Sequence, residues 1–233
     1  MGKLYMAYNR FRNFVYSVEP IRKAYYRLKI NARNKALSEK LVQDQDRNLG
    51  LIVEALRGLD IQAFCAYGTL LGIVRDGGLI PYDTDMDMAI LESESFSWDA
   101  LEKALESHGL KKECSYAYEG NVTEQRYILP DGLWVDFFLF QKKDPDTLRS
   151  FFYFKDRTVA YENRDVFHVK ANYYPMIHGV TEMEFHGMRV PVPENPEKHV
   201  EDVYGPGWRT PDPNCRPDEK VNRMPKLGRM IRV

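Results

Sequence analysis

The stretch "GTLLGIVRDGGLIPYDTDMDMAIL", residues 68–91, joins a Gly-Thr pair and an arginine to a run of acids and then to apolar residues. Asp83, Asp85 and Asp87 occupy alternate positions there, and an extended chain directs alternate side chains to the same face. Carboxylates that close repel one another and resist joint ionisation. We therefore expect positive charge among them, from a metal ion or a basic side chain, unless bulk water surrounds the segment.

The alternation favours a metal site at the start of a strand. Asp85 and Asp87 would present two carboxylates side by side, while Met86 and Met88 face the other way into a core. A hard divalent cation such as Mg²⁺ or Mn²⁺ prefers carboxylate oxygens and removes their mutual repulsion. An acidic surface turn would carry the same short pattern, so this pair of acids is not decisive on its own.

A fourth acid stands in an apolar setting. Asp136 is the single charge in "LWVDFFLF", residues 133–140, whose nearly continuous apolar character predicts a buried central strand. An isolated buried carboxylate costs several kcal/mol, on the order of a lost ion pair, unless it is paired or metal-bound. Asp136 is thus a candidate third metal ligand, a candidate base for an attacking hydroxyl, or the partner of a buried arginine.

Residues ahead of the acids fit an anionic ligand. Gly68 and Thr69 would let backbone N–H groups and a hydroxyl approach a phosphate closely. Arg75 can offer a bidentate fork to the same anion. Taken in order, the Gly-Thr pair, the arginine, the alternating acids and the buried Asp136 favour a metal-phosphate site over an acidic surface turn.

The whole chain has the composition of a globular protein that buries a sizeable core. It has 233 residues, 44% of them hydrophobic and 29% charged, and a net charge of −1, so no overall field points toward nucleic acid. Cys65, Cys114 and Cys215 lie far apart, which favours reduced thiols over a disulfide framework. The five histidines are also scattered, and a zinc site is not expected.

The remaining pattern predicts an α+β domain over residues 38–233, a mixed β-sheet flanked by helices. Ser38 is the predicted N-cap of a helix that runs to Gly58, and the segment from Pro206 is expected to be loop. Further helices are predicted at 98–109 and 196–205, and strands at 60–68, 86–91, 111–118, 125–129, 133–140, 165–176 and 185–193.

Residues 1–37 are predicted to form a basic helical extension. Residues 1–35 carry nine Lys and Arg against one acid, Glu19, and apolar residues recur at helical spacing. Such a helix either lies on an anionic membrane surface or packs on protein with its basic face in water. No apolar run is long enough to span a membrane, and Arg10 and Arg12 interrupt any signal peptide. We expect a cytoplasmic protein, with peripheral attachment to the cytoplasmic face of the membrane as a function of the extension.

The stretch "YGTLLGIVRDGGLIPYDTDMDMAI" closely resembles the LicD/fukutin family of nucleotidyltransferase-fold phosphotransferases, whose pattern is approximately GTLLGxxRxxxxIPWDDDIDI. The similarity continues in "LWVDFFLF" and in "FHGMRVPVPENPEKHVEDVYGPGW", and covers roughly residues 40–211. Two positions depart from the pattern. Tyr82 stands where the family usually has Trp, and Thr84 where it usually has Asp, which leaves the aromatic plate and the metal pair intact.

The resemblance implies a nucleotidyltransferase-like fold and transfer of a phosphoalcohol (phosphocholine, glycerol phosphate or ribitol phosphate) from a CDP-linked donor to a glycan hydroxyl, with release of CMP. It implies the following roles by position: metal ligands and catalytic acids Asp85, Asp87 and Asp136, with Mg²⁺ or Mn²⁺, and substrate-binding residues Gly68, Thr69, Arg75, Tyr82 and Asp83. The partners would be the CDP-alcohol and a glycan or lipid-linked glycan.

Two alternative functions remain: one uses the same residues for a different reaction, and the other uses none of them. A nucleotidyltransferase in the strict sense would move NMP from an NTP to a small molecule and release pyrophosphate, and the Gly-Thr and alternating-acid parts serve that reaction equally. A membrane-bound adaptor with a degenerate site would work through its basic helices alone. The intact set of acids argues against the adaptor.

Overall fold

The computed structural model describes residues 19–155, 163–212 and 226–233, with the backbone alone for residues 19–30. The predicted apolar stripe of the first 18 residues lies outside the described residues. The helices are α2 (Glu19–Gln43), α3 (Gln45–Leu56), α4 (Tyr67–Asp76), α5 (Trp98–Ser107) and α6 (Pro196–Tyr204). The strands are β1 (Gln62–Cys65), β2 (Met86–Leu91), β3 (Lys111–Tyr118), β4 (Asn121–Ile128), β5 (Trp134–Asp144), β6 (Thr147–Phe154), β7 (Val166–Pro175), β8 (Val180–Phe185), β9 (Met188–Pro193) and β10 (Lys226–Arg232).

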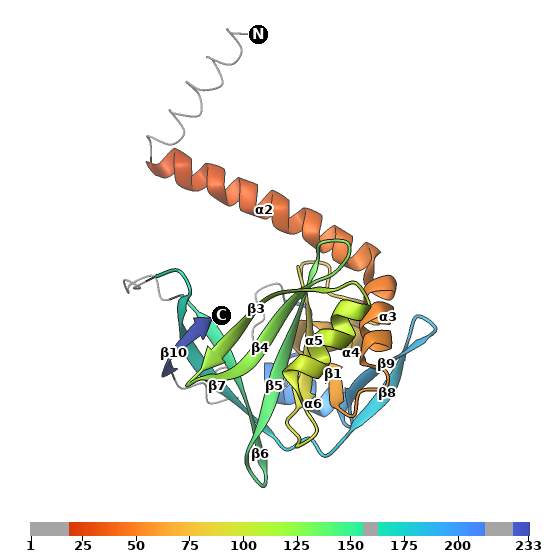
Figure 1. Cartoon of the computed structure of the whole chain (residues 1–233). Helices are drawn as coiled ribbons and strands as arrows, with labels where there is room; N and C mark the ends of the chain where they lie inside the picture. Colours follow the sequence, from red (N-terminus) through yellow and green to blue (C-terminus); the bar gives the residue numbers. More distant parts are fainter. Residues whose placement is uncertain (1–18, 156–162, 213–225) are drawn as a thin grey trace.

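The large sheet has the order β1-β2-β5-β4-β3-β10-β7-β6, and β6 also pairs with β5. Strand β5 contacts β4 through its first half and β6 through its second half, so six strands close on themselves. The pairing of β2 with β5 is parallel and the other pairings in the sheet are antiparallel. Hairpin β8–β9 stands beside β1 (Figure 1). The fold is the expected mixed sheet flanked by helices.

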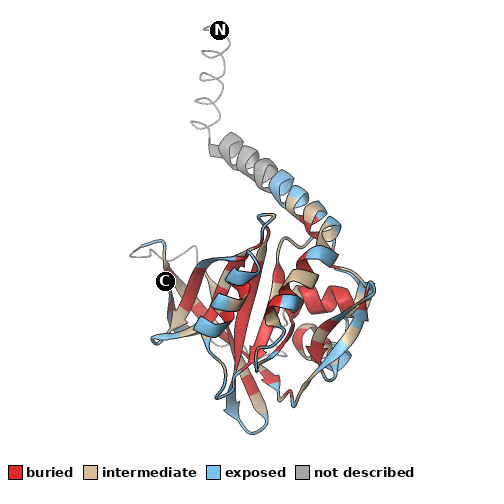
Figure 2. Ribbon diagram, turned by 45° about the vertical axis from the view of Figure 1, so that its right-hand side comes forward, coloured by how far each residue is buried: buried red, intermediate tan, exposed pale blue. Residues whose placement is uncertain are grey.

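The two faces of β2 and β5 contribute to different hydrophobic clusters. Met86, Met88 and Ile90 of β2 join Val135 and Phe137 of β5 in the largest core cluster, beneath the helices. The alternate residues lie on the opposite face, where Ala89 and Phe138 belong to a second cluster. Figure 2 shows these central strands buried along most of their length. The acids of the predicted site therefore share the face that is turned away from the main core, as the alternation predicted.

Three expectations about local structure were wrong. Ser38 is not an N-cap, because α2 continues to Gln43 and the Ser38 hydroxyl donates to the carbonyl of Pro81 at 2.5 Å. The helix break falls at Asp44, one residue before α3 begins. The strand expected over residues 60–68 ends at Cys65, and residues 67–76 form helix α4. In the segment expected to be loop, residues 226–232 form strand β10, which pairs with both β3 and β7 and completes the closed set of strands.

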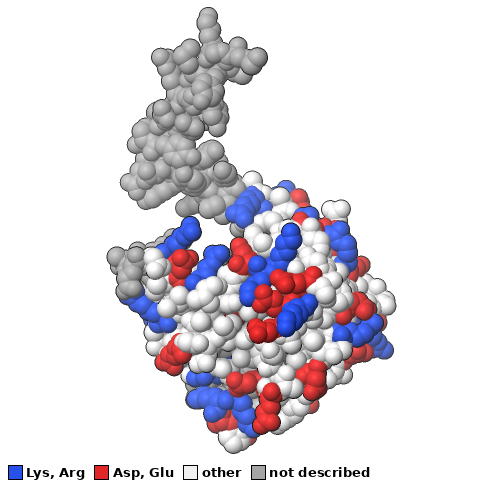
Figure 3. Space-filling model, in the orientation of Figure 1, with Lys and Arg blue, Asp and Glu red and all other residues white. Residues whose placement is uncertain are grey.

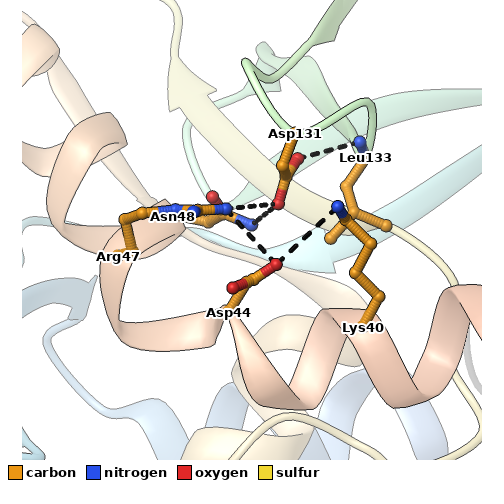
Figure 4. Close-up of polar contacts among 6 residues, drawn as sticks. All are labelled: Lys40, Asp44, Arg47, Asn48, Asp131 and Leu133. Atoms are coloured by element: carbon orange, nitrogen blue, oxygen red, sulfur yellow. Dashed lines mark hydrogen bonds and ion pairs between the residues drawn. The ribbon is translucent and has the colours of Figure 1, made fainter.

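The break between α2 and α3 is tied to the turn between β4 and β5 (Figure 4). The Asp131 carboxylate accepts hydrogen bonds from the side chains of Arg47 at 2.9 Å and Asn48 at 2.8 Å, and from the Leu133 backbone N–H at 3.0 Å. Burial raises the pKa of Asp131, but these hydrogen bonds outweigh it and hold that pKa below its ordinary value. Because β4 and β5 extend from this turn, Asp131 fixes their position against the helices.

The amino-terminal part of α2 projects away from the domain (Figure 1). In the carboxyl-terminal half of α2, Arg33 lies 5.6 Å from the ring centre of Trp134 and the Ser38 hydroxyl donates to the Pro81 carbonyl. The helix therefore rests on the start of β5 and on the loop that leads into β2. Positive and negative side chains are interspersed over the face drawn in Figure 3. Among the described residues, no helix is both long and apolar enough to cross a membrane.

Candidate active site

The site is organised around the start of β2, where helix α4 meets the acids. The backbone N–H of Ala66 donates to the Asp87 carbonyl at 2.9 Å, and the backbone N–H of Asp87 donates to the Thr69 hydroxyl at 2.9 Å. The Gly68 N–H, in the first turn of α4, hydrogen-bonds the Asp87 carboxylate. The free N–H groups and the positive end of the helix dipole therefore face the acidic cluster.

Gly68 is required by close approach. A Cβ placed on Gly68 would lie 2.2 Å from Oδ2 of Asp83 and 3.8 Å from Oδ2 of Asp87. The residue before it, Tyr67, adopts a φ of 41°, which is uncommon outside glycine and marks a tightly constrained turn. Tyr67 is held there by hydrogen bonds of its hydroxyl to Ser150 at 2.8 Å and Tyr174 at 3.2 Å. No pattern in the sequence indicated this anchor.

The acids repel one another as predicted. Burial, followed by the charge of Asp83 and a hydrogen bond with it, raises the pKa of Asp85 to about 7. Burial and the charges of Asp85, Asp83 and Asp136 raise the pKa of Asp87 well above its ordinary value, although the Gly68 N–H opposes this. Such pKa shifts arise when buried carboxylates lie close together and nearby positive charge does not compensate their negative charge. A bound cation would lower both pKa values.

Asp136 has an arginine partner, which is one of the roles that the sequence left open. Arg126 lies opposite Asp136 in the β4–β5 register and binds it with both arms, Nε to Oδ1 at 2.7 Å and Nη2 to Oδ2 at 2.6 Å. The side chain of Asp136 is buried, and burial raises its pKa to about 6, although Arg126 opposes the rise. Asp87 is the register neighbour of Asp136 on β2, so the two carboxylates share one face.

Arg75 and Tyr82 lie together near the loop that precedes β2. The Arg75 guanidinium binds its chain neighbour Asp76 through Nε at 2.9 Å and Nη2 at 2.7 Å, and it hydrogen-bonds Tyr82. Its buried Nη1 has no hydrogen-bond partner among the described residues. Tyr82 is 41% exposed. Two nitrogens of Arg75 are thus engaged by Asp76, and the third, Nη1, is buried and unpaired among the described residues.

The family model for the LicD/FKTN/FKRP nucleotidyltransferase domain matches residues 60–195, more than half of the chain. The chain belongs to this family. The match runs from the segment before β1 to the start of α6 and contains the acids and the Gly-Thr pair, within the wider span of 40–211 that the resemblance indicated. No curated protein shows significant similarity to the chain. Membership of the LicD family supports a phosphotransferase in general.

The acids of this LicD-family domain fit a divalent cation in charge, and less well in arrangement. Burial and then the charges of neighbouring acids raise the pKa values of Asp85 and Asp87, and a bound cation would offset both causes. Within the described ranges, however, no three His, Cys, Asp or Glu side chains are arranged to hold a metal ion together. The third candidate, Asp136, has both carboxyl oxygens bound by Arg126. A metal site that used Asp136 would need this ion pair to change.

Sequence reasoning missed two charged residues beside the candidate site, Arg126 and Glu124. They occupy alternate positions in β4 and share the face of Asp136. Glu124 is 1% exposed, and neither of its carboxyl oxygens has a hydrogen-bond partner in the described part of the chain. The signal that could have found them is the one that found Asp136: charges at alternate positions of a strand that is otherwise buried.

A cavity of about 610 Å³ lies elsewhere, between α3, β1 and hairpin β8–β9. Apolar side chains such as Val53, Ile61 and Met188 line it together with Arg57 and Glu54, which pair with each other at 2.9 Å. None of the predicted site residues contributes to its lining. The chemistry that the family membership implies is therefore assigned to the acidic face of β2 and β5.

Proposed function

We propose that the protein is a metal-dependent phosphotransferase. It moves a phosphoalcohol of the phosphocholine, glycerol phosphate or ribitol phosphate class from a CDP-linked donor to a hydroxyl of a cell-surface glycan and releases CMP. The observation that carries the proposal is the pair Asp85 and Asp87, whose pKa values are raised by burial and mutual repulsion beside the amino-terminal end of α4, inside a LicD-family domain. A site of this charge is suited to a cation and a diphosphate together.

Asp85 and Asp87 would hold Mg²⁺ or Mn²⁺, and Asp136 would join them if Arg126 released it. A divalent ion bound there neutralises the diphosphate of the donor and the charge that develops on the leaving CMP. The N–H groups at the start of α4 would face the donor phosphates. Asp83, Thr69 and Gly68 would shape the floor of this phosphate site, since they contact Asp85 and Asp87.

The reaction is a displacement at phosphorus. The acceptor hydroxyl oxygen forms a bond to the phosphorus that bears the alcohol, and the bond from that phosphorus to the bridging oxygen of CMP breaks. The proton of the hydroxyl passes to a carboxylate. Asp136 is the candidate base if it stays on Arg126 and does not bind the metal, because it borders Asp87 and Arg126 then favours its ionised form. Arg75 and the half-exposed ring of Tyr82 would contact the donor.

The test is a thermal-shift panel, with and without Mn²⁺, across CDP-choline, CDP-glycerol, CDP-ribitol, CTP and ATP, followed by product analysis. Metal-dependent stabilisation by one CDP-alcohol and release of CMP are expected. Stabilisation by a triphosphate alone, with pyrophosphate as product, would support the nucleotidyltransferase alternative, which the acids alone do not exclude. An Asp87→Asn variant should stay folded and lose turnover at least about 100-fold, and full turnover by that variant would contradict the assignment.

The basic extension is proposed to bring the enzyme to an anionic membrane surface on the cytoplasmic face. Lys and Arg near such a surface contribute about 1 kcal/mol each, and nine of them lie in residues 1–35. A chain lacking residues 1–30 keeps Arg33 over Trp134 and Ser38 on Pro81. It should lose co-sedimentation with phosphatidylserine vesicles and keep turnover on a soluble acceptor. Unchanged vesicle binding would reject this role.

A further inference from the structure

Glu124 is a buried acid that neither the family resemblance nor the proposed reaction uses. It lies on β4 between register neighbours Tyr116 of β3 and Phe138 of β5. It is 1% exposed, and both carboxyl oxygens are without a hydrogen-bond partner in the described residues. Buried carboxylates are nearly always hydrogen-bonded or paired, because desolvation of an unpaired one is costly. An orphan of this kind requires an explanation.

Arg126, a positive charge that acts on Glu124, is paired with a different acid. Arg126 is two positions along the same face of β4 and uses its fork on Asp136. Alternate residues of a strand have Cα atoms about 6.6 Å apart, a distance that an arginine side chain can cover by rotating. Arg126 lowers the pKa of Glu124, whereas burial and the charges of Asp136 and Asp87 raise it well above the ordinary value. The four groups therefore interact electrostatically.

Tyr153 is a possible hydrogen-bond partner of Arg126 whether the arginine pairs with Asp136 or with Glu124. Its hydroxyl accepts a hydrogen bond from Nη2 of Arg126 at 3.1 Å. Burial and then the charge of Glu124 raise the pKa of Tyr153, so Tyr153 interacts electrostatically with Glu124 as well. Its ring is stacked on Tyr116, with ring centres 3.9 Å apart, which fixes the hydroxyl in place. A guanidinium that moved from Asp136 toward Glu124 could keep Tyr153 as a partner.

A cation beside Asp87 and Asp136 would disturb the present pairing. A divalent ion and the Arg126 guanidinium are like charges that seek the same carboxylate oxygens of Asp136, in a buried setting where repulsion is strong. If Asp136 simply exchanged Arg126 for the metal, a buried arginine would be left without its acid, which is costly. Glu124 offers that arginine a second carboxylate.

We propose that Glu124 is a positioning residue that receives the guanidinium of Arg126 when Asp136 turns to a bound divalent cation. The arginine thus has two acids, Asp136 in the metal-free protein and Glu124 in the metal-bound one. This proposal rests on the metal dependence in the proposed function. It explains why a strand carries a buried acid with no partner, and why the candidate metal ligands are not gathered around a common point in the structure.

The first experiment measures Mn²⁺ affinity of the full-length chain by electron paramagnetic resonance of the free ion. Glu124→Gln should weaken Mn²⁺ binding about tenfold or more, because Arg126 would stay on Asp136. The matched control is Glu113→Gln, which removes an acid on β3 that also acts on Asp136 but is partly exposed. The control should change Mn²⁺ affinity less than about threefold. Equal effects of the two variants, or no effect of Glu124→Gln, would overturn the proposal.

A double-mutant cycle separates positioning from direct action on the metal. In an Arg126→Gln background, Glu124→Gln should leave Mn²⁺ affinity nearly unchanged, because Glu124 acts through the arginine. A tenfold loss in both backgrounds would show that Glu124 acts on the ion itself and would reject the proposal. If wild-type protein binds no Mn²⁺ at any pH, the proposed function fails first, and that outcome is distinct from a failure of the Glu124 role alone.

A spectroscopic arm does not depend on how well the Arg126→Gln variant folds. The Arg126 side-chain Nε–H resonance of ¹⁵N-labelled protein should shift on addition of Mg²⁺ in the wild type, because its acceptor changes. The shift should be absent in Glu124→Gln, whose metal-free thermal stability should be equal to or above that of the wild type, because the lost carboxylate makes no hydrogen bond. A Mg²⁺-induced shift that is the same in both proteins would refute the exchange.

Discussion

Replacing Asp85 by asparagine should stabilise the metal-free protein at alkaline pH. The pKa of Asp85 is raised from 3.8 to about 7 by burial and by Asp83. Below about pH 4 the group is protonated in both the folded and the unfolded state and contributes nothing to the free energy of unfolding. As pH rises toward 7, the unfolded state loses its proton first, so stability falls, and above pH 7 the penalty is constant.

The magnitude follows from the size of that shift. About three pKa units correspond to about 4 kcal/mol at pH 8. This is an upper bound, because neighbouring acids share the repulsion and Asp85 keeps some contact with solvent. A gain of about 1–3 kcal/mol in the free energy of unfolding is expected for Asp85→Asn at pH 8, which is about 3–10 °C in Tm for a chain of this size.

The assay is urea denaturation and thermal unfolding in the presence of a chelator at pH 4.5, 6 and 8, with the exposed Asp60→Asn as control. The advantage of Asp85→Asn over the wild type should grow from pH 4.5 to pH 8, while the control stays level. Added Mn²⁺ should stabilise the wild type more at pH 8 than at pH 6, because protons compete for Asp85, and should not stabilise Asp85→Asn. A variant less stable than the wild type at pH 8 would refute the reasoning.

Three further perturbations test the surroundings of the site. Gly68→Ala should lower the free energy of unfolding by about 1–3 kcal/mol, because its Cβ would lie 2.2 Å from Oδ2 of Asp83. The control Gly50→Ala, in helix α3 with nothing within 4 Å of its Cβ, should be neutral or stabilising by up to about 1 kcal/mol. Equal effects of the two variants in chemical denaturation would argue against the close approach. Asp131→Asn should lower the free energy of unfolding by about 1–3 kcal/mol at pH 7. Because the pKa of Asp131 is lowered in the folded protein, this difference from the wild type should shrink as pH falls below 4. A pH-independent difference in urea denaturation would contradict this. Burial raises the pKa of the Cys65 thiol to about 12, so it should react with a thiol reagent only at the rate of unfolding; rapid labelling of native protein, followed by peptide mapping, would show that the thiol is accessible.

Patterns within single segments were enough to predict much of the fold. Alternation of Asp85 and Asp87 with Met86 and Met88 placed the acids and the core on opposite faces of β2, because side chains of a strand alternate. The apolar run around Asp136 predicted a central strand, and β5 is buried between β2 and β4. Helix α5 begins after the Ser97 cap and ends before Gly109, whose φ is 86°. These are local rules that need no partner.

The predictions that failed depended on partners distant in sequence. Ser38 has the chemistry of an N-cap, but it lies within α2 and its hydroxyl bonds Pro81. The polar segment after Pro206 gave no strand pattern, yet residues 226–232 form β10 because the edges of β3 and β7 are available to pair with them. Local propensity at such positions is weak, so tertiary pairing decides.

The sequence by itself determined which residues are candidates for the chemistry, since the motif places Gly68, Asp85 and Asp87 in one short segment where chain geometry alone brings them together. The electrostatic state of the site was decided by the tertiary structure. Arg126 meets Asp136, and Glu124 is left without a partner, because the register of β4 against β5 sets which side chains face one another. A shift of one residue in that register would send these charges to opposite faces, and no local pattern in either strand specifies it.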